Sequence, residues 1–260
     1  MKTINLNSDV GEGFGVYDIG NDEDMLASVS SANIACGFHA GDPNVMSRVI
    51  KTAKKRNVSI GAHPGFNDIW GFGRRRIYMP MDEIEASVAY QIGALQAMAV
   101  IENTKVTHVK PHGALNNMSS ESADIAKAIT RGISGVDKNL ILVAVAGSYL
   151  FNSGIEVGLR VASEAYADRS YEDDGNMTSR KFDHAMIRNE QQAVKQVRSI
   201  VLDGIIIANS GKKIPVSVDT ICIHGDEPTG PAIASAVKEM LEKEGVILKP
   251  LPEMQLRQQK

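Results

Sequence analysis

The stretch THVKPHGAL, residues 107–115, places His108, Lys110 and His112 at alternate positions. Because successive side chains of a β-strand point to opposite faces, these three share one face and Val109 lies on the other. A strand with helices packed on both sides is apolar on both faces, and this one is not. The alternation therefore favours a strand that turns a polar face into a confined interior. His112 then lies at the mouth, and His108, the lowest of the three, is expected to be structural.

Seven apolar runs are expected to form strands, at residues 3–8, 32–37, 58–63, 106–112, 140–145, 160–167 and 219–225. Segments with helical periodicity or capping residues lie between and after them, at 22–30, 42–57, 80–103, 119–132, 148–158, 188–208 and 228–244. This alternation predicts a parallel sheet with helical crossovers. It fits both an open, doubly wound sheet and a closed barrel.

The two faces of the expected strands decide between these folds. Most of the strands have one apolar face, and the other face is small or polar and becomes ionisable towards the carboxyl end. A barrel buries the first face under helices and turns the second inward, where space is limited. The sequence therefore predicts an α/β fold, a (β/α) barrel of seven strands, as a single domain over residues 1–260.

The composition narrows the class of protein. Hydrophobic residues make up 43% of the 260 residues and charged residues 23%, which is typical of a globular protein with a substantial core. A formal net charge of −3 gives no basic footprint for nucleic acid. We see no apolar leader and no segment of membrane-spanning length, and expect a cytoplasmic protein with no membrane partner. Cys36 and Cys222 lie in apolar runs and are expected to be buried free thiols.

Four of the six histidines follow apolar runs and precede small residues or proline: His39 in GFHAGD, His63 in GAHPG, His112 in KPHGAL and His224 in CIHGD. The carboxyl ends of barrel strands form the rim on which barrel active sites are built. A single histidine there is as readily a core or loop residue as a functional one. Four of them on four different strands indicate a shared site.

Carboxylates end the same strands: Asp9, Glu12, Asp42, Asp168 and Asp226. Glu164 lies one alternation deeper than Asp168, so its buried charge needs a partner, and Lys110 is the obvious one. Crowded ionisable groups of this kind acquire shifted pKa values, which general acid–base catalysis requires. Asp42 precedes Pro43 and is better explained as a helix N-cap.

Two long irregular stretches, 64–79 and 168–187, carry arginines. Loops of this length are usually functional or disordered. In WGFGRRRIY (70–78), Arg74 or Arg75 would suit a lid that clamps a carboxylate or phosphate, although a solvated charge run is the simpler alternative. Arg169, beside Asp168, is a further candidate for substrate binding, and Arg76 is expected at the surface.

Nucleotide-binding and serine-nucleophile motifs are absent from the sequence. DVGEGFG lacks the GxGxxG spacing, NSGKK is not a P-loop, and no GxSxG elbow occurs. A divalent metal stays open, because rim carboxylates and histidines are suitable ligands. Lys110, between His108 and His112, would disfavour a cation beside that pair.

With these motifs assembled, the chain resembles the LamB/YcsF family. The resemblance rests on LNSDVGEGFG, ANIACGFHAGDP, IGAHPGFNDIWGFGRR, HVKPHGAL, EAYADRSY and ICIHGDEP, in this order. The family's motif positions correspond here to Asp9, Glu12, His39, His63, Arg74, Arg75, Lys110, His112, Glu164, Asp168, Arg169, His224 and Asp226. Asn116 departs from the tyrosine that usually follows HGAL, and GNMTSRKF (175–182) is less apolar than usual.

The resemblance implies a barrel related to the glycoside hydrolase/deacetylase folds. It also implies a 5-oxoprolinase activity, the ATP-dependent opening of the lactam 5-oxoproline (pyroglutamate) to glutamate, in a complex with partner subunits B and C. Since the chain has no phosphate loop, ATP is expected to be handled wholly or partly by these partners. Arg74, Arg75 and Lys110 would then hold an anionic intermediate, while Asp9 or a histidine activates water and another rim acid protonates the leaving nitrogen.

Two other functions remain open on the residues alone. One is a stand-alone, metal-dependent hydrolase that removes acyl groups from a sugar or amide. The other is a non-catalytic subunit that binds a small acid and presents it to partners; the number of rim acids and histidines exceeds what such binding needs.

Overall fold

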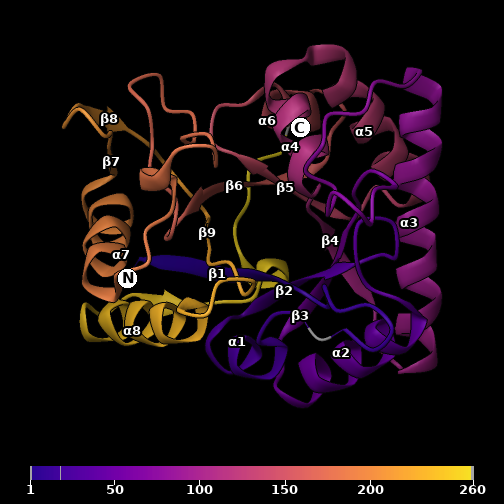
Figure 1. Cartoon of the computed structure of the whole chain (residues 1–260), viewed down its shortest axis with the longest axis horizontal. Coiled ribbons are helices and arrows are strands. Elements are labelled where there is room, and N and C mark those ends of the chain that lie inside the picture. The colour runs from indigo at the N-terminus through magenta and orange to yellow at the C-terminus, as the bar shows by residue number, and fades with distance from the viewer. Residues whose placement is uncertain (1, 18, 259–260) are drawn as a thin grey trace.

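The computed structural model describes residues 2–17 and 19–258, and seven parallel strands within it close into a barrel. These strands are β1 (Thr3–Val10), β2 (Ser31–Ala35), β3 (Ser59–His63), β4 (Val106–Val109), β5 (Ile141–Val145), β6 (Arg160–Tyr166) and β9 (Thr220–Cys222). Each pairs with the next, and β9 also pairs with β1, which closes the ring. Figure 1 shows the strands around the middle of the molecule and the helices outside them. The predicted seven-stranded barrel is confirmed.

Eight α-helices are assigned within the described residues: α1 (Asp22–Ser28), α2 (Pro43–Lys55), α3 (Met81–Ile101), α4 (Gly113–Glu121), α5 (Ala123–Val136), α6 (Tyr149–Glu156), α7 (Glu190–Arg198) and α8 (Gly230–Lys243). Asp42 caps α2, as predicted: its Oδ1 accepts from the backbone N–H groups of Asn44 and Val45 at 2.8 and 2.9 Å. The expected helix at 119–132 is instead two helices, α4 and α5, which meet at Ser122.

The expected helix at 188–208 was wrong in its last part. After α7 the chain makes a π-helical turn (Ser199–Asp203), and Gly204 then takes a left-handed conformation with φ of 71°. The β-branched run that follows forms β7 (Ile205–Ile207), which pairs antiparallel with β8 (Lys213–Pro215). Strand β4 also ends earlier than expected, at Val109, and Pro111, two residues on, has no N–H to donate to a sheet.

Helix α3 corrects one expectation from the sequence. It is long and apolar enough to cross a membrane, judged by length and composition, although we expected no such segment. In the barrel it packs against α5, β3 and β4, and Ile84, Val88, Ile92 and Leu95 are buried there. These contacts are those of a barrel helix, and the cytoplasmic location stays a prediction.

The carboxyl-terminal segment covers the amino-terminal end of the barrel. It runs through β10 (Ile247–Leu248), which pairs with β1, and a 3₁₀ turn (Leu251–Glu253). Leu251 packs on residues of β5 and β6 in a small apolar cluster. Its N–H donates to Ser31 Oγ, and Asn5 Nδ2 donates to the carbonyl of Lys249. Within residues 2–17 and 19–258, the polar interior is therefore covered at the amino-terminal end and opens at the carboxyl ends of the strands.

Candidate active site

Polar side chains fill the barrel in layers. The layer next to the closed end joins Asn5 to Ser31 Oγ at 2.8 Å, and Ser31 to Ser59 at 2.7 Å. Above it, Asn33 donates to Asn7 Oδ1 at 2.8 Å, and His108 Nε2 lies 3.1 Å from Asn33 Oδ1. His108 is fully buried, and burial together with the charge of Lys110 lowers its pKa to about 3. It is a neutral residue below the mouth, as expected for a structural role.

Lys110 forms the centre of the next layer. Its Nζ lies 3.0 Å from Asp9 Oδ1, 3.1 Å from Glu164 Oε1 and 3.0 Å from Cys222 Sγ. The predicted pair of Lys110 with Glu164 is therefore present, and Asp9 joins it. Burial works against the charge of Lys110, but attraction to Asp9, Cys222 and Glu164 raises its pKa well above the ordinary value. The ammonium stays charged inside the barrel.

Asp9 connects this layer to the histidines at the mouth. Its Oδ1 faces Lys110, and its Oδ2 lies 3.3 Å from His63 Nε2. Burial raises the pKa of Asp9, but His63 and Lys110 outweigh burial and hold the pKa well below its ordinary value. The two oxygens of one carboxylate thus face an ammonium on one side and an imidazole on the other.

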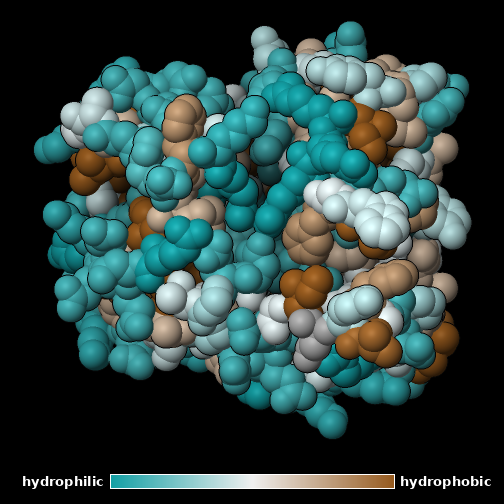
Figure 2. Space-filling view, in the orientation of Figure 1, coloured by the Kyte–Doolittle hydropathy of each residue, from teal (hydrophilic) through white to brown (hydrophobic). Residues whose placement is uncertain are grey.

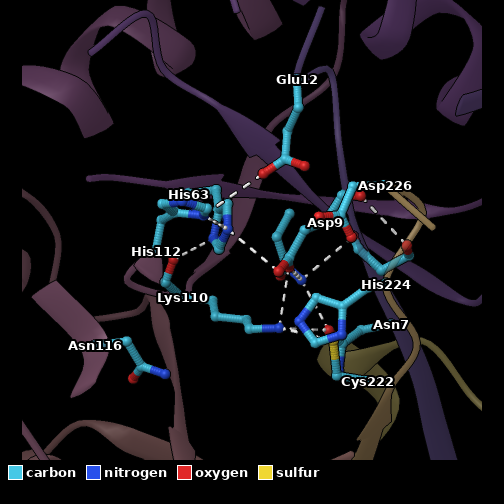
Figure 3. A network of polar contacts seen from close by, with 12 residues as sticks. Asn7, Asp9, Glu12, His63, Lys110, His112, Asn116, Cys222, His224 and Asp226 are labelled. Atoms are coloured by element: carbon cyan, nitrogen blue, oxygen red, sulfur yellow. Dashed lines mark hydrogen bonds and ion pairs between the residues drawn. The ribbon is translucent and has the colours of Figure 1, made fainter. Parts of the chain in front are cut away.

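His39, His63, His112 and Glu12 form a buried cluster, to which we refer as the histidine cluster. Figure 3 shows Glu12, His63 and His112 beside Asp9. His63 Nε2 lies 3.0 Å from His112 Nδ1, and the His39 and His112 rings stack with centroids 3.7 Å apart. Glu12 Oε1 is 3.5 Å from both His39 Nε2 and His112 Nδ1. Burial and the neighbouring histidines hold the pKa values of His39 and His112 well below ordinary. Burial and Asp9 raise the pKa of Glu12.

The loop at 64–79 packs directly on this cluster. The carbonyl of Phe72 accepts a hydrogen bond from His112 Nε2 at 2.8 Å. Gly73 has φ of 62°, and a Cβ there would lie 2.7 Å from His39 Cβ and 2.8 Å from His112 Cδ2. Only glycine therefore lets this loop lie so close to the rings.

His224 forms a separate pair with Asp168 on the other side of the mouth. Its Nδ1 lies 2.9 Å from Asp168 Oδ1, and its backbone N–H donates to Oδ2 at 3.0 Å. The ring stacks on Tyr166, with centroids 5.5 Å apart. Burial raises the pKa of Asp168, but the contacts with His224 outweigh it and lower the pKa. A carboxylate that accepts from Nδ1 leaves Nε2 of the imidazole able to take a proton.

The arginines are placed differently from one another. Arg74 pairs with Asp226 at 2.6 Å and lies over the Phe72 ring. Arg75 pairs with the buried Asp68 within its own loop, and its side chain is 66% exposed. Arg169 is buried and donates to the carbonyls of Thr178 and Ala185. Arg75 and Arg169 therefore hold the two long loops in place, and their contact with substrate stays a prediction.

The structure brings together Asp9, Glu12, His39, His63, Lys110, His112, Glu164, Asp168, His224, Asp226 and Arg74 at the open end of the barrel. As expected, Cys36 and Cys222 are buried free thiols, and Arg76 lies at the surface, where it pairs with Glu121. Asn116 is buried in α4 beside the Tyr166 hydroxyl, at 3.4 Å, apart from the Lys110 network in Figure 3.

Several residues of the site were missed from the sequence. Asn7, Asn33 and Cys222 face inward, and their strand parity could have identified the first two as neighbours of Asp9. Arg180 was also missed: it is partly buried, and burial together with the charges of Arg74 and Arg169 lowers its pKa. Arg180 lies in an irregular loop with no periodicity, and nothing in the sequence pointed to it.

Comparison with known proteins agrees with the architecture. The family model described as "LamB/YcsF family" matches residues 4–256. The 5-oxoprolinase A-subunit from Natranaerobius thermophilus is 46% identical over 251 residues, which is 96% of this chain and 98% of the relative. The A-subunit from Staphylococcus carnosus is 48% identical over 243 residues, 94% of this chain and 96% of the relative.

Solved structures show the same relationship. A lactam utilization protein from Thermus thermophilus superimposes with a TM-score of 0.91 at 38% identity, covering 96% of this chain and 100% of the other. A T48 deacetylase, at 13% identity and a TM-score of 0.52, covers 99% of this chain and 94% of the other and shares the fold alone. The family match over nearly the whole chain, with relatives close to half identical, shows that this chain belongs to the LamB/YcsF family.

Proposed function

We propose that this chain is the A-subunit of a 5-oxoprolinase, which opens the lactam ring of 5-oxo-L-proline to give L-glutamate with ATP, together with subunits B and C. The relatives named for this activity match the chain along nearly its whole length. The observation that carries the proposal is the buried Lys110 held by Asp9 and Glu164, next to the His224–Asp168 pair, at the open end of the barrel. This combination offers a fixed positive charge beside a proton acceptor.

The chemistry of a lactam explains why ATP is needed. The ring amide is stabilised by resonance, and phosphorylation of its oxygen turns the carbonyl carbon into a better electrophile. Water then adds to that carbon, the C–N bond breaks as the ring nitrogen takes a proton, and hydrolysis of the resulting acyl phosphate releases phosphate and glutamate. Since the sequence has no phosphate loop, we assign the phosphorylation step to the partner subunits.

The residues of this chain suit the ring-opening step. His224 Nε2 takes a proton from the attacking water and passes it to the ring nitrogen as the C–N bond breaks, while Asp168 fixes the ring through Nδ1. Lys110 and Arg74 stabilise the anionic intermediate. Polar atoms of Asp9, Cys222 and His224 lie within 4.8 Å of one another, and Lys110 Nζ contacts both Asp9 and Cys222. The acceptor and the cation thus act on the same small volume.

Exposed side chains in the loops around the mouth suit a surface that binds a partner protein. Val16 and Trp70, in the loops after β1 and β3, are 93% and 97% exposed, and Tyr17 and Tyr78 are also largely exposed. In the view of Figure 1, the surface over the middle of the barrel is mainly hydrophilic and apolar patches lie towards its edges (Figure 2). Exposed aromatic side chains next to a polar site suit contact with another protein of the complex that delivers a phosphorylated substrate.

The decisive experiment reconstitutes the chain with subunits B and C and measures glutamate formation that depends on both ATP and 5-oxoproline. His224→Ala and Lys110→Met should each abolish most of this activity. His184→Ala is a matched control, because His184 is exposed and lies in the loop after β6. If the two site variants turn over like the wild type, this assignment of the active site is wrong.

A stand-alone acyl hydrolase remains the second candidate, and the histidine cluster is the observation that favours it. That candidate predicts that the isolated chain, with a divalent ion and without ATP, deacylates an acetylated sugar or amide. The third candidate, a subunit that only binds a small acid, predicts that site variants change KM and leave kcat intact. The reconstituted assay and an assay of the isolated chain separate all three.

A further inference from the structure

Two backbone carbonyls fix the proton positions in the histidine cluster. His63 Nδ1 lies 2.7 Å from the carbonyl of Lys110, and His112 Nε2 lies 2.8 Å from the carbonyl of Phe72. A carbonyl oxygen only accepts, so both of these ring nitrogens must carry hydrogen and donate it. In the neutral rings, His63 Nε2 and His112 Nδ1 therefore have no hydrogen and expose lone pairs.

These two lone pairs point at each other across 3.0 Å. Asp9 Oδ2 adds a third acceptor, 3.3 Å from His63 Nε2, and Glu12 Oε1 adds a fourth, 3.5 Å from His112 Nδ1. One extra proton on His63 Nε2 would provide a donor for one of these contacts. The remaining contacts would still join two acceptors with no hydrogen between them. Glu12 Oε1 and both ring nitrogens of His39 are buried and have no hydrogen-bond partner among the described residues. Such groups are costly to bury unless something positive binds them.

The dimensions fit a metal ion. One atom each from Glu12, His39, His63 and His112 lies within 4.8 Å of the others, and the closest contacts between them are 3.0 to 3.5 Å. Tetrahedral Zn²⁺ with bonds of about 2.0–2.1 Å holds its ligand atoms roughly 3.3 Å apart. Metal-binding histidines almost always donate the other ring N–H to a carbonyl or carboxylate, and His63 and His112 both donate to carbonyls.

We propose that Glu12, His39, His63 and His112 bind one divalent transition-metal ion of the class that prefers imidazole ligands, with Zn²⁺ as the probe. Lys110 does not oppose this site. Its ammonium contacts Asp9 Oδ1, Glu164 and Cys222, whereas Asp9 Oδ2 faces His63, so the Asp9 carboxylate lies between the ammonium and the cluster. Three imidazoles with one carboxylate favour zinc or a similar ion over magnesium or calcium. Such an ion would supply a Lewis acid at the mouth.

The metal site follows from these contacts and does not depend on the 5-oxoprolinase activity, so its test measures binding and not turnover. The full chain is stripped with a chelator and titrated with ZnCl₂ by calorimetry, and with Co²⁺ while the visible spectrum is recorded. We expect one ion per chain, a rise in Tm on binding, and intense four-coordinate Co²⁺ bands without the near-ultraviolet band that a thiolate ligand gives. His63→Ala, His112→Ala and Glu12→Gln should each weaken binding by at least about tenfold, the lower end of what removal of even an outer-shell partner costs.

His184→Ala and Cys222→Ser are the matched controls and should bind like the wild type. Circular dichroism establishes that each variant is folded, and the stoichiometry and Co²⁺ spectrum of the wild type test the proposal even if a variant does not fold. The proposal is overturned if the folded wild type takes up no Zn²⁺ or Co²⁺ at micromolar concentrations. It is also overturned if binding survives in His63→Ala and His112→Ala but is lost in Cys222→Ser, because the ion then belongs to the Asp9–Cys222–His224 set.

Discussion

Lys110 Nζ and Asp9 Oδ1 lie 3.0 Å apart in the barrel interior, where both side chains are less than a tenth exposed. The ion pair is therefore shielded from water, and either charge left alone there would be strongly unfavourable. Glu164 contacts the same ammonium, so one lysine balances two buried carboxylates. The site depends on this balance for its stability as well as for its charge.

Replacing Lys110 with methionine should lower the free energy of unfolding by about 3–5 kcal/mol, because the buried carboxylates of Asp9 and Glu164 lose their partner. Urea unfolding followed by circular dichroism measures the loss. The double variant Lys110→Met/Glu164→Gln should be more stable than the single one, since one orphaned charge is removed. A double variant no more stable than Lys110→Met would contradict the role of Glu164 in this balance.

His108 should make the protein sensitive to mild acid. Burial lowers the pKa of His108 in the folded chain to about 3. Between this value and the ordinary pKa of 6.5, the unfolded chain therefore binds a proton at His108 and the folded chain does not. The resulting stability is fully present above the ordinary pKa of 6.5 and is lost progressively as the pH falls towards 3, at up to about 1.4 kcal/mol per pH unit.

His108→Gln tests this, since the glutamine amide can still donate towards Asn33. Unfolding is measured at several pH values between 7 and 4 in wild type and variant. The difference between the two slopes isolates His108 from the other buried histidines. Parallel slopes would show that the pKa of His108 is the same in the folded and unfolded chains and would contradict this prediction.

Asp168→Asn should reduce glutamate formation by roughly 10²–10⁴-fold in the reconstituted enzyme, because the His224 ring loses the carboxylate that orients it and stabilises its protonated form. The KM for 5-oxoproline should change little. Asp173→Asn, in an exposed part of the same loop, is the control. A large rise in KM with kcat preserved would instead place Asp168 in substrate binding.

Gly73→Ala should disturb the histidine cluster. The left-handed backbone costs about 1–2 kcal/mol for a residue with a Cβ, and the new methyl group meets the Cβ of His39 and the ring of His112. Gly147→Ala is a close control, because Gly147 has φ of 75° but nothing within 4 Å of its Cβ position. The Tm and the rate of glutamate formation should both be lower in Gly73→Ala than in Gly147→Ala. Equal effects in the two variants would mean that the loop can move away from the rings at no cost.

Arg74 and Arg75 should behave differently despite being neighbours. Arg74→Ala removes a cation from the mouth and should lower kcat/KM about 10- to 100-fold, the usual size of a hydrogen bond to a charged group. Arg75→Ala breaks the contact with Asp68 and should leave kcat/KM nearly unchanged while making the loop at 64–79 easier to cleave with protease. The reverse order of effects would assign the substrate contact to Arg75.

Strand parity explains why much of the site was predictable. Period-two alternation fixes both the face and the relative height of a side chain, so Lys110 and Glu164 could be paired from two separate strands. The same rule placed His108 below His112. It also applies to Asn7 and Asn33, whose amides continue the network of Asp9, although a neutral side chain, unlike a buried charge, does not by itself require a partner.

Features that depend on irregular backbone were not predictable in this way. The Phe72 carbonyl that fixes His112 comes from a loop whose path turns on Gly73. Arg180, whose pKa responds to the charges of Arg74 and Arg169, lies in an irregular loop. The β7–β8 hairpin arises where an apolar run that resembles a helix is interrupted at Gly204. In each case a left-handed glycine or a long loop sets the geometry. Neither produces the regular alternation of side chains from which strands and helices are predicted.

The covering of the barrel's closed end by the carboxyl-terminal segment has a consequence for biosynthesis. Strand β1 is made before the other strands of the barrel and pairs with β9 and β10, so Asn5 stays unpaired until Thr220 has been made, and Ile4 until Leu248 has been made. The ring cannot close until Thr220–Cys222 have been made, and its lower end cannot be covered until Leu251 has followed. Contacts so distant in sequence are slow to form. A nascent chain truncated before Thr220 lacks β9 and should therefore expose open sheet edges on β1 and β6 and depend on chaperones for its solubility.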